Sequence, residues 1–60
     1  MRWDVGVQVG EERGQVTVHP HQIEKSECWT AVEFAMALTQ EQHPTKKIEF
    51  MYVKEWWNEV

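Results

Sequence analysis

Hydrophobic and polar residues alternate at the start of the chain. Trp or Val occupies positions 3, 5, 7 and 9, and Asp, Gly or Gln occupies positions 4, 6 and 8. After the polar stretch 11–14, in which Gly14 can take a left-handed turn conformation, the alternation resumes with Val16 and Val18. A period of two with β-branched and aromatic residues is typical of strands buried on one face. The two runs therefore predict a β-hairpin.

The middle of the chain predicts a single helix. Residues 27–42 contain neither Gly nor Pro and are rich in Ala, Glu, Met, Leu and Gln, which favour helices. Ser26 is the expected N-cap, and His43-Pro44 is the expected end of the helix. The residues between Pro20 and Ser26 are expected to form a connection.

A third strand is predicted over residues 46–54, where apolar and polar positions alternate again. A right-handed crossover through the helix sets this strand parallel to the second one. The first strand then lies in the middle of a three-stranded antiparallel sheet in the order 2-1-3, with one helix packed on one face. The sequence thus predicts a ββαβ arrangement of the α+β class, in a single small domain over residues 1–60 because sixty residues are too few for two.

The faces of the third strand determine which side chains are left exposed. The residues expected to face the helix are Ile48, Phe50, Tyr52 and Trp56. The residues expected on the opposite sheet face are Met51, Val53 and Trp57. One helix cannot cover that second face, and exposed Trp and Met beside charged residues are typical of binding hot spots. Alternatively, Trp56 or Trp57 folds back over an edge of the sheet.

These positions define a candidate partner-binding surface. Its apolar anchor comprises Met51, Val53, Trp56 and Trp57. Its acidic rim comprises Glu49, Glu55 and Glu59. A second candidate interface is the flank of the helix that carries Trp29 or Phe34. The apolar arc of the helix, centred on Cys28, Ala31, Val32 and Ala35, covers more of its circumference than a small sheet needs. The alternative is that these two aromatic residues wrap the edge of the sheet.

Composition and charge narrow the range of partners. Ten acidic against six basic residues give a formal net charge of −4, which counts against nucleic acid and fits a partner with a basic surface. Cys28 is the single cysteine, so an intrachain disulfide is excluded and the cytoplasm is the expected compartment. The sequence has neither the pattern of a signal peptide nor an apolar run of the ~18 residues that a membrane span needs.

The residues capable of chemistry do not form a recognised motif. His19, His21 and Cys28 lack the spacing of a zinc site, and His43 lies at the far end of the predicted helix. Cys28 is expected to be a small buried hydrophobic residue rather than a nucleophile. A phosphate-binding loop requires glycines directly before a helix, and none of the three glycines is in such a position. We therefore expect no enzyme activity, no metal and no cofactor.

The architecture also resembles a class of small viral proteins. The chain combines an N-terminal Trp3-Asp4-Val5-Gly6-Val7 hairpin strand, an Ala-rich helix, a Pro-containing turn and a terminal strand that ends in aromatic residues. In this it is similar to small early proteins of bacteriophages, which include an inhibitor of bacterial RNA polymerase and some anti-CRISPR proteins. The resemblance lies in size and architecture. It implies a host-takeover protein that occludes a site on one host enzyme.

The leading expectation is a non-catalytic protein-binding module, an inhibitor or adaptor that masks a functional surface of a larger host protein. The first alternative is a homodimer or a structural component of an assembly, in which the uncovered sheet face or the Trp29/Phe34 flank meets another copy. The second alternative is a small nucleic-acid-binding domain, which would require affinity that falls steeply with salt.

Overall fold

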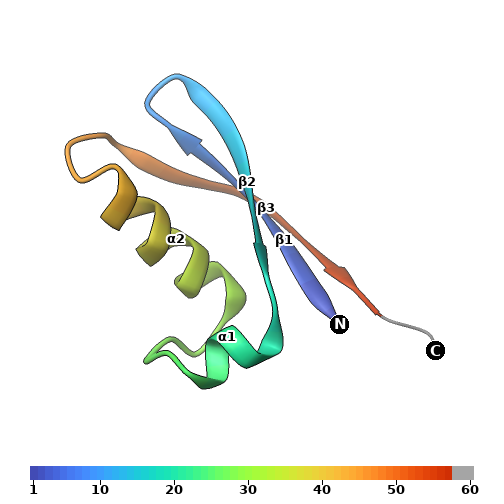
Figure 1. Ribbon diagram of the computed structural model, residues 1–60. Coiled ribbons are helices and arrows are strands. Elements are labelled where there is room, and N and C mark those ends of the chain that lie inside the picture. The colour runs from blue at the N-terminus through green and yellow to red at the C-terminus, as the bar shows by residue number, and fades with distance from the viewer. Residues whose placement is uncertain (58–60) are drawn as a thin grey trace.

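The computed structural model describes residues 1–57 and has one helical layer on one face of a three-stranded sheet (Figure 1). The elements follow in the order β1 (Arg2–Val9), β2 (Glu12–Val18), α1 (Pro20–Glu24), α2 (Ala31–Gln42) and β3 (Ile48–Trp56). The sheet order is β2-β1-β3, and β1 is antiparallel to both neighbours. The expected α+β class and strand order are confirmed.

The hairpin turns at Gly10, four residues earlier than Gly14. Val9 pairs with Glu12, so Gly10 and Glu11 form a two-residue turn. Gly10 has a φ of 62°, which only glycine adopts readily, whereas Gly14 lies within β2 opposite Val7. The prediction that Gly14 supplies the turn is wrong. The Gly10 N–H donates to the carbonyl of Lys47 at 2.9 Å, which joins this turn to the start of β3.

The helical region is divided between two elements. Pro20 opens the short helix α1 at a position where a missing N–H costs little, and the Gln22 side chain accepts a hydrogen bond from the His19 N–H at 2.8 Å. The main helix then begins at Ala31 instead of residue 27, because the Thr30 hydroxyl accepts from the Glu33 N–H at 3.1 Å.

Ser26 is therefore not the cap of the main helix. Its hydroxyl donates to the Ile23 carbonyl at 3.0 Å and accepts from the Cys28 N–H at 3.1 Å, which closes the end of α1. The predicted end of the main helix is confirmed, since His43 is its C-cap and donates its N–H to the Thr39 carbonyl.

The core lies between the sheet and α2. In the described chain its buried hydrophobic members are Val5, Val7, Val18, Ala31 and Ala35. Small alanines let the helix lie close to the valines of β1 and β2, and larger side chains pack around them. No helix of the described chain covers the opposite face of the sheet, called the open face below (Figure 1).

Candidate interaction surface

A β-bulge in β3 changes which of its side chains share a face. Val7 pairs with Phe50 and Gly6 pairs with Tyr52, so Met51 is an extra residue between two successive pairs. Before the bulge, Phe50 shares the helix side with the core residue Val7. After the bulge, the alternation is displaced by one position along the chain.

The displacement corrects the expected faces of β3. Val53 pairs with the core residue Val5 and therefore lies on the helix side, whereas Tyr52 and Trp56 lie on the open face. The expectation that Tyr52 and Trp56 face the helix and that Val53 faces away is wrong. Its physical reason is the extra residue Met51, which an unbroken alternation does not include.

The aromatic side chains of the open face are held by hydrogen bonds to the other strands. Trp56 Nε1 donates to Asp4 Oδ2 at 2.6 Å, and the Thr17 hydroxyl donates to Asp4 Oδ1 at 3.0 Å. Farther along, the Tyr52 hydroxyl bonds to Gln15 Oε1 at 3.0 Å. These contacts cross all three strands and fix the positions of Trp56 and Tyr52.

Glycine at position 6 lets the Tyr52 ring lie close against the sheet. A Cβ at Gly6 would overlap ring carbons of Tyr52. The Lys54 ammonium lies 5.8 Å from the centroid of the Tyr52 ring, and the Arg2 guanidinium lies 5.4 Å from the Trp56 ring. The open face near β3 is thus amphipathic, with cations above aromatic rings.

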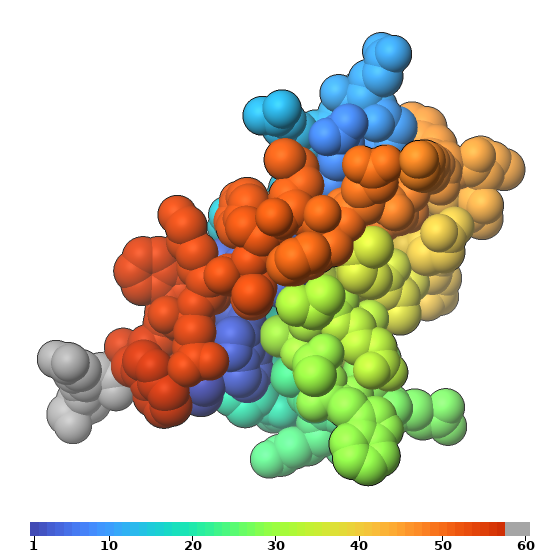
Figure 2. Space-filling model, turned by 180° about the vertical axis from the view of Figure 1, so that it is seen from behind, coloured from blue at the N-terminus to red at the C-terminus, as the bar shows by residue number. Residues whose placement is uncertain are grey.

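Exposed apolar side chains concentrate along β3. Seven large hydrophobic residues of the described chain are exposed, and six of them lie between residues 50 and 57: Phe50, Met51, Tyr52, Val53, Trp56 and Trp57. On the helix side, Phe50 is 47% exposed and Val53 is 44% exposed. Figure 2 shows β3 crossing the surface beside α2, with the start of β1 visible between them.

The strand is also an edge of the sheet. Within residues 1–57, β3 has a neighbouring strand on one side only, so one row of its backbone N–H and C=O groups has no strand partner. All four predicted anchor residues are exposed, but they are spread over both faces of this edge strand.

The predicted acidic rim is mixed in sign. Glu49 lies 3.1 Å from Lys47, and Glu55 Oε2 accepts a hydrogen bond from Trp3 Nε1 at 3.0 Å on the helix side. Lys54 lies between these acids along the strand. Glu59, the third predicted rim residue, lies outside the described residues.

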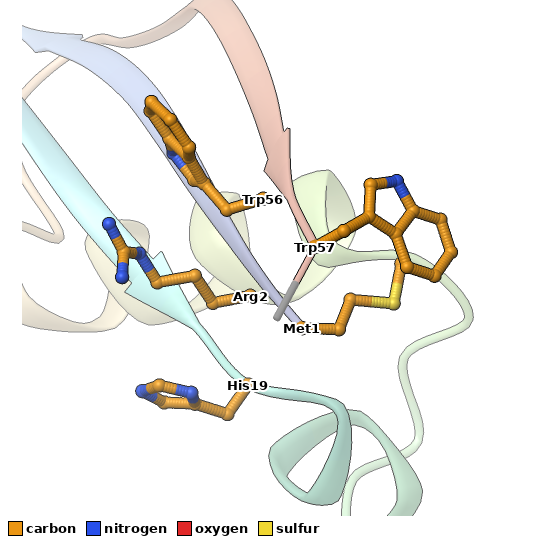
Figure 3. Close-up of a pocket in the computed structure, with 5 residues that line it drawn as sticks. All are labelled: Met1, Arg2, His19, Trp56 and Trp57. Carbon is orange, nitrogen blue, oxygen red and sulfur yellow. The ribbon is translucent and has the colours of Figure 1, made fainter. Parts of the chain in front are cut away.

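The end of β3 borders an open depression of about 310 Å³ (Figure 3). Its lining residues are Met1, Arg2, His19, Trp56 and Trp57. Figure 3 shows the two indoles pointing apart, with the Met1 thioether beside Trp57. Trp56 is turned onto the sheet by its bond to Asp4, whereas Trp57 is 69% exposed. Of the two, Trp56 therefore behaves as the residue that folds back.

The second candidate interface is rearranged by the later start of α2. Trp29 precedes the helix and is 88% exposed, while Phe34 lies on the helix, partly buried against the core. Cys28 also precedes the helix. The expectation that Cys28 lies at the centre of the apolar arc of the helix is therefore wrong. Trp29 instead borders an apolar depression of about 350 Å³, which Trp3 and Ile23 also line.

Residues with potential for chemistry are dispersed. Among residues 1–57, no group of three or more His, Cys, Asp or Glu side chains is close enough to hold a metal ion. His19 and His21 stack on each other, with ring centroids 5.7 Å apart. No helix in the described part of the chain has the length and apolarity required to cross a membrane.

Comparison with known proteins adds no relative. No family model matches the chain, and neither a curated protein nor a solved structure is significantly similar to it.

Proposed function

We propose that the protein is a non-catalytic binding module that attaches to a larger protein through β3 and Trp57. The observation that carries this proposal is the concentration of exposed apolar side chains on one edge strand and on Trp57 directly after it, together six of seven in the described chain. Contiguous exposed apolar surface on a small domain is characteristic of an interaction site. Tryptophan is also the residue type most enriched among binding hot spots.

The backbone of β3 supplies a second means of attachment. An extended segment of a partner can add to a free sheet edge, with main-chain hydrogen bonds for affinity and side chains on both faces for specificity. β3 has this free edge in the described chain, and Phe50 and Val53 flank it on the helix side. The net charge of −4 favours a partner with a basic surface and accelerates its association.

Binding of this kind inhibits by masking a surface. A domain of sixty residues that binds through an edge strand acts on a larger protein by covering part of its surface. This mode of action agrees with the resemblance to bacteriophage proteins that occlude a host enzyme. We place the interaction in the cytoplasm, because the single cysteine excludes an intrachain disulfide.

A nucleic-acid-binding function receives less support from the same residues. Stacking of bases on Tyr52 and Trp56 would need cations free for phosphates. Lys54 and Arg2 instead lie over these two rings, and Arg2 is also 3.7 Å from Asp4.

The test compares two exposed tryptophans, Trp57 on the proposed surface and Trp29 on the second candidate interface. Tagged wild type, Trp57→Ala and Trp29→Ala are each used to capture proteins from nuclease-treated bacterial lysate. Both variants remove an exposed indole, so both are expected to fold. Affinity for the captured protein is then measured with purified components.

We expect Trp57→Ala to weaken binding about 30-fold, which corresponds to about 2 kcal/mol for a hot-spot residue. Trp29→Ala is expected to change affinity less than about threefold. Equal affinity of wild type and Trp57→Ala would contradict the proposal. A loss confined to Trp29→Ala would transfer the site to the depression beside α2.

A further inference from the structure

The bulge gives β3 a symmetrical pattern of faces. About the point between Met51 and Tyr52, the pairs 50/53, 49/54 and 48/55 each have both residues on the same side of the sheet. Phe50 and Val53 pair with core valines of β1 and lie on the helix side. Glu49 pairs with Gln8 and Lys54 with Asp4, so both lie on the open face. A strand with unbroken alternation cannot have this arrangement, because residues separated by three or five positions would lie on opposite faces.

We propose that the free edge of β3 pairs antiparallel with β3 of a second copy of the chain. The two-fold axis is normal to the sheet and passes between Met51 and Tyr52. In this register Glu49 stands opposite the partner's Lys54, and Phe50 stands opposite the partner's Val53. The symmetry repeats each contact, so two opposite-charge pairs form on the open face and two apolar pairs form on the helix side.

The charges of β3 select this register over its neighbours. An axis through Lys54 sets this lysine opposite its own copy in the second chain, and an axis through Glu55 sets two copies of that carboxylate opposite each other. Both registers are unfavourable because like charges meet. An axis through Val53 sets Phe50 opposite Trp56, although these side chains lie on different faces. The register centred between Met51 and Tyr52 matches the faces of the pairs 48/55, 49/54 and 50/53 and brings opposite charges together.

A second copy also covers what a single copy leaves exposed. Helix α2 leaves Phe50 47% exposed and Val53 44% exposed, and each would meet an apolar partner across the axis. The Lys47–Glu49 ion pair lies at the surface and is too weak to keep Glu49 from a cross-strand partner. The result is a continuous six-stranded sheet with both helical layers on one face.

This inference is independent of the proposed function. The dimer covers the edge that a larger protein would use, so the two forms of association compete. The dimer test needs only the purified chain, and its failure leaves capture of another protein unaffected. Conversely, a chain that captures no other protein can still dimerise in the register described.

The experiment exchanges the charges that face each other. Molar mass is measured by sedimentation equilibrium for wild type, Glu49→Lys, Lys54→Glu, the double variant and an equimolar mixture of the two single variants. In a dimer of either single variant, residue 49 of each chain stands opposite a residue 54 of the same charge, so like charges meet at both symmetric positions. The double variant and the mixture restore opposite charges at both. Glu11→Lys, in the hairpin turn, makes the same charge change as Glu49→Lys away from the edge.

We expect wild type and Glu11→Lys to dimerise, each single variant to dimerise at least about tenfold more weakly, and the double variant and the mixture to regain wild-type affinity. A wild type that remains monomeric up to about 1 mM overturns the proposal. So does a dimer that neither single variant weakens, or a mixture that stays monomeric while both components are folded by circular dichroism.

A second measurement does not depend on variants that fold. In a dimer assembled from labelled and unlabelled chains, nuclear Overhauser contacts between chains are expected to join the Phe50 ring to the partner's Val53 methyl groups. Within one copy these two residues stand opposite Val7 and Val5, which are only two positions apart on the same face, so the labelling scheme is what separates the contact between chains from the one inside a chain. A dimer that lacks the contact contradicts the register.

Discussion

Replacing Asp4 by alanine tests whether the open face is held together as described. The carboxylate of Asp4 is nearly buried, accepts hydrogen bonds from Trp56 and Thr17 at 2.6 and 3.0 Å, and lies 3.7 Å from Arg2. A hydrogen bond to a charged group contributes about 1.5 kcal/mol or more, and an exposed ion pair adds about 0.5 kcal/mol. Together these contacts come to about 3.5 kcal/mol, but the variant no longer desolvates a carboxylate, and Trp56 and Thr17 are exposed enough to bond to water, so we expect a net loss of about 2 kcal/mol.

That loss is large for a domain of this size. Sixty residues correspond to a free energy of unfolding of about 3 to 9 kcal/mol. In urea, with a slope of about 1 kcal/mol/M, the midpoint of Asp4→Ala is expected to fall by about 2 M. Asp4→Asn keeps one of the two acceptor positions and is expected to lose about half as much. Glu41→Ala removes an exposed carboxylate from α2 as a control and is expected to change stability by less than about 0.5 kcal/mol. An Asp4→Ala midpoint equal to that of Glu41→Ala would refute the reasoning.

Two further predictions concern positions where the structure departs from expectation. Gly10→Ala is expected to lower the free energy of unfolding by about 1 kcal/mol, because φ is 62° at this position. Gly14→Ala, where the added methyl group meets open space within β2, is expected to leave it unchanged. Urea unfolding of the two variants tests the difference. If Gly14→Ala were the destabilised variant and Gly10→Ala were neutral, the hairpin would turn elsewhere. Thr30→Ala removes the cap of α2 and is expected to cost about 1 kcal/mol and some helical circular dichroism signal; no change in either quantity would contradict the cap.

Alternation predicted the strands and the right-handed crossover rule predicted their order, but neither predicted the bulge. Residues 50–53 are Phe, Met, Tyr and Val, four apolar residues in succession. A period-of-two pattern contains no face information across such a run, so an inserted residue leaves no trace in it. Met51, Val53 and Trp57, the residues expected on the uncovered face, are exposed. The exposure of Tyr52 and Trp56 and the assignment of the β3 side chains to the two faces required the pairing of Gly6 with Tyr52 and of Val7 with Phe50.

The helix start was missed for a related reason. Ser26 and Thr30 are both acceptable caps by residue type. The signal that favours Thr30 is Glu33 three residues later, and the Ser26 hydroxyl is already occupied at the end of α1. Pro20 followed by Gln22 marks the start of α1, and this pair is the signal from which that helix could have been predicted.

The claim that β3 is the interaction surface is tested most directly by photocrosslinking. The photoreactive amino acid p-benzoylphenylalanine replaces Val53 on the exposed edge, or Ala37 on the exposed side of α2, and the protein is irradiated in bacterial lysate. We predict a discrete adduct from position 53, with a larger protein or with a second copy, and none from position 37. An adduct from position 37 alone, or the same products from both positions, would contradict the account.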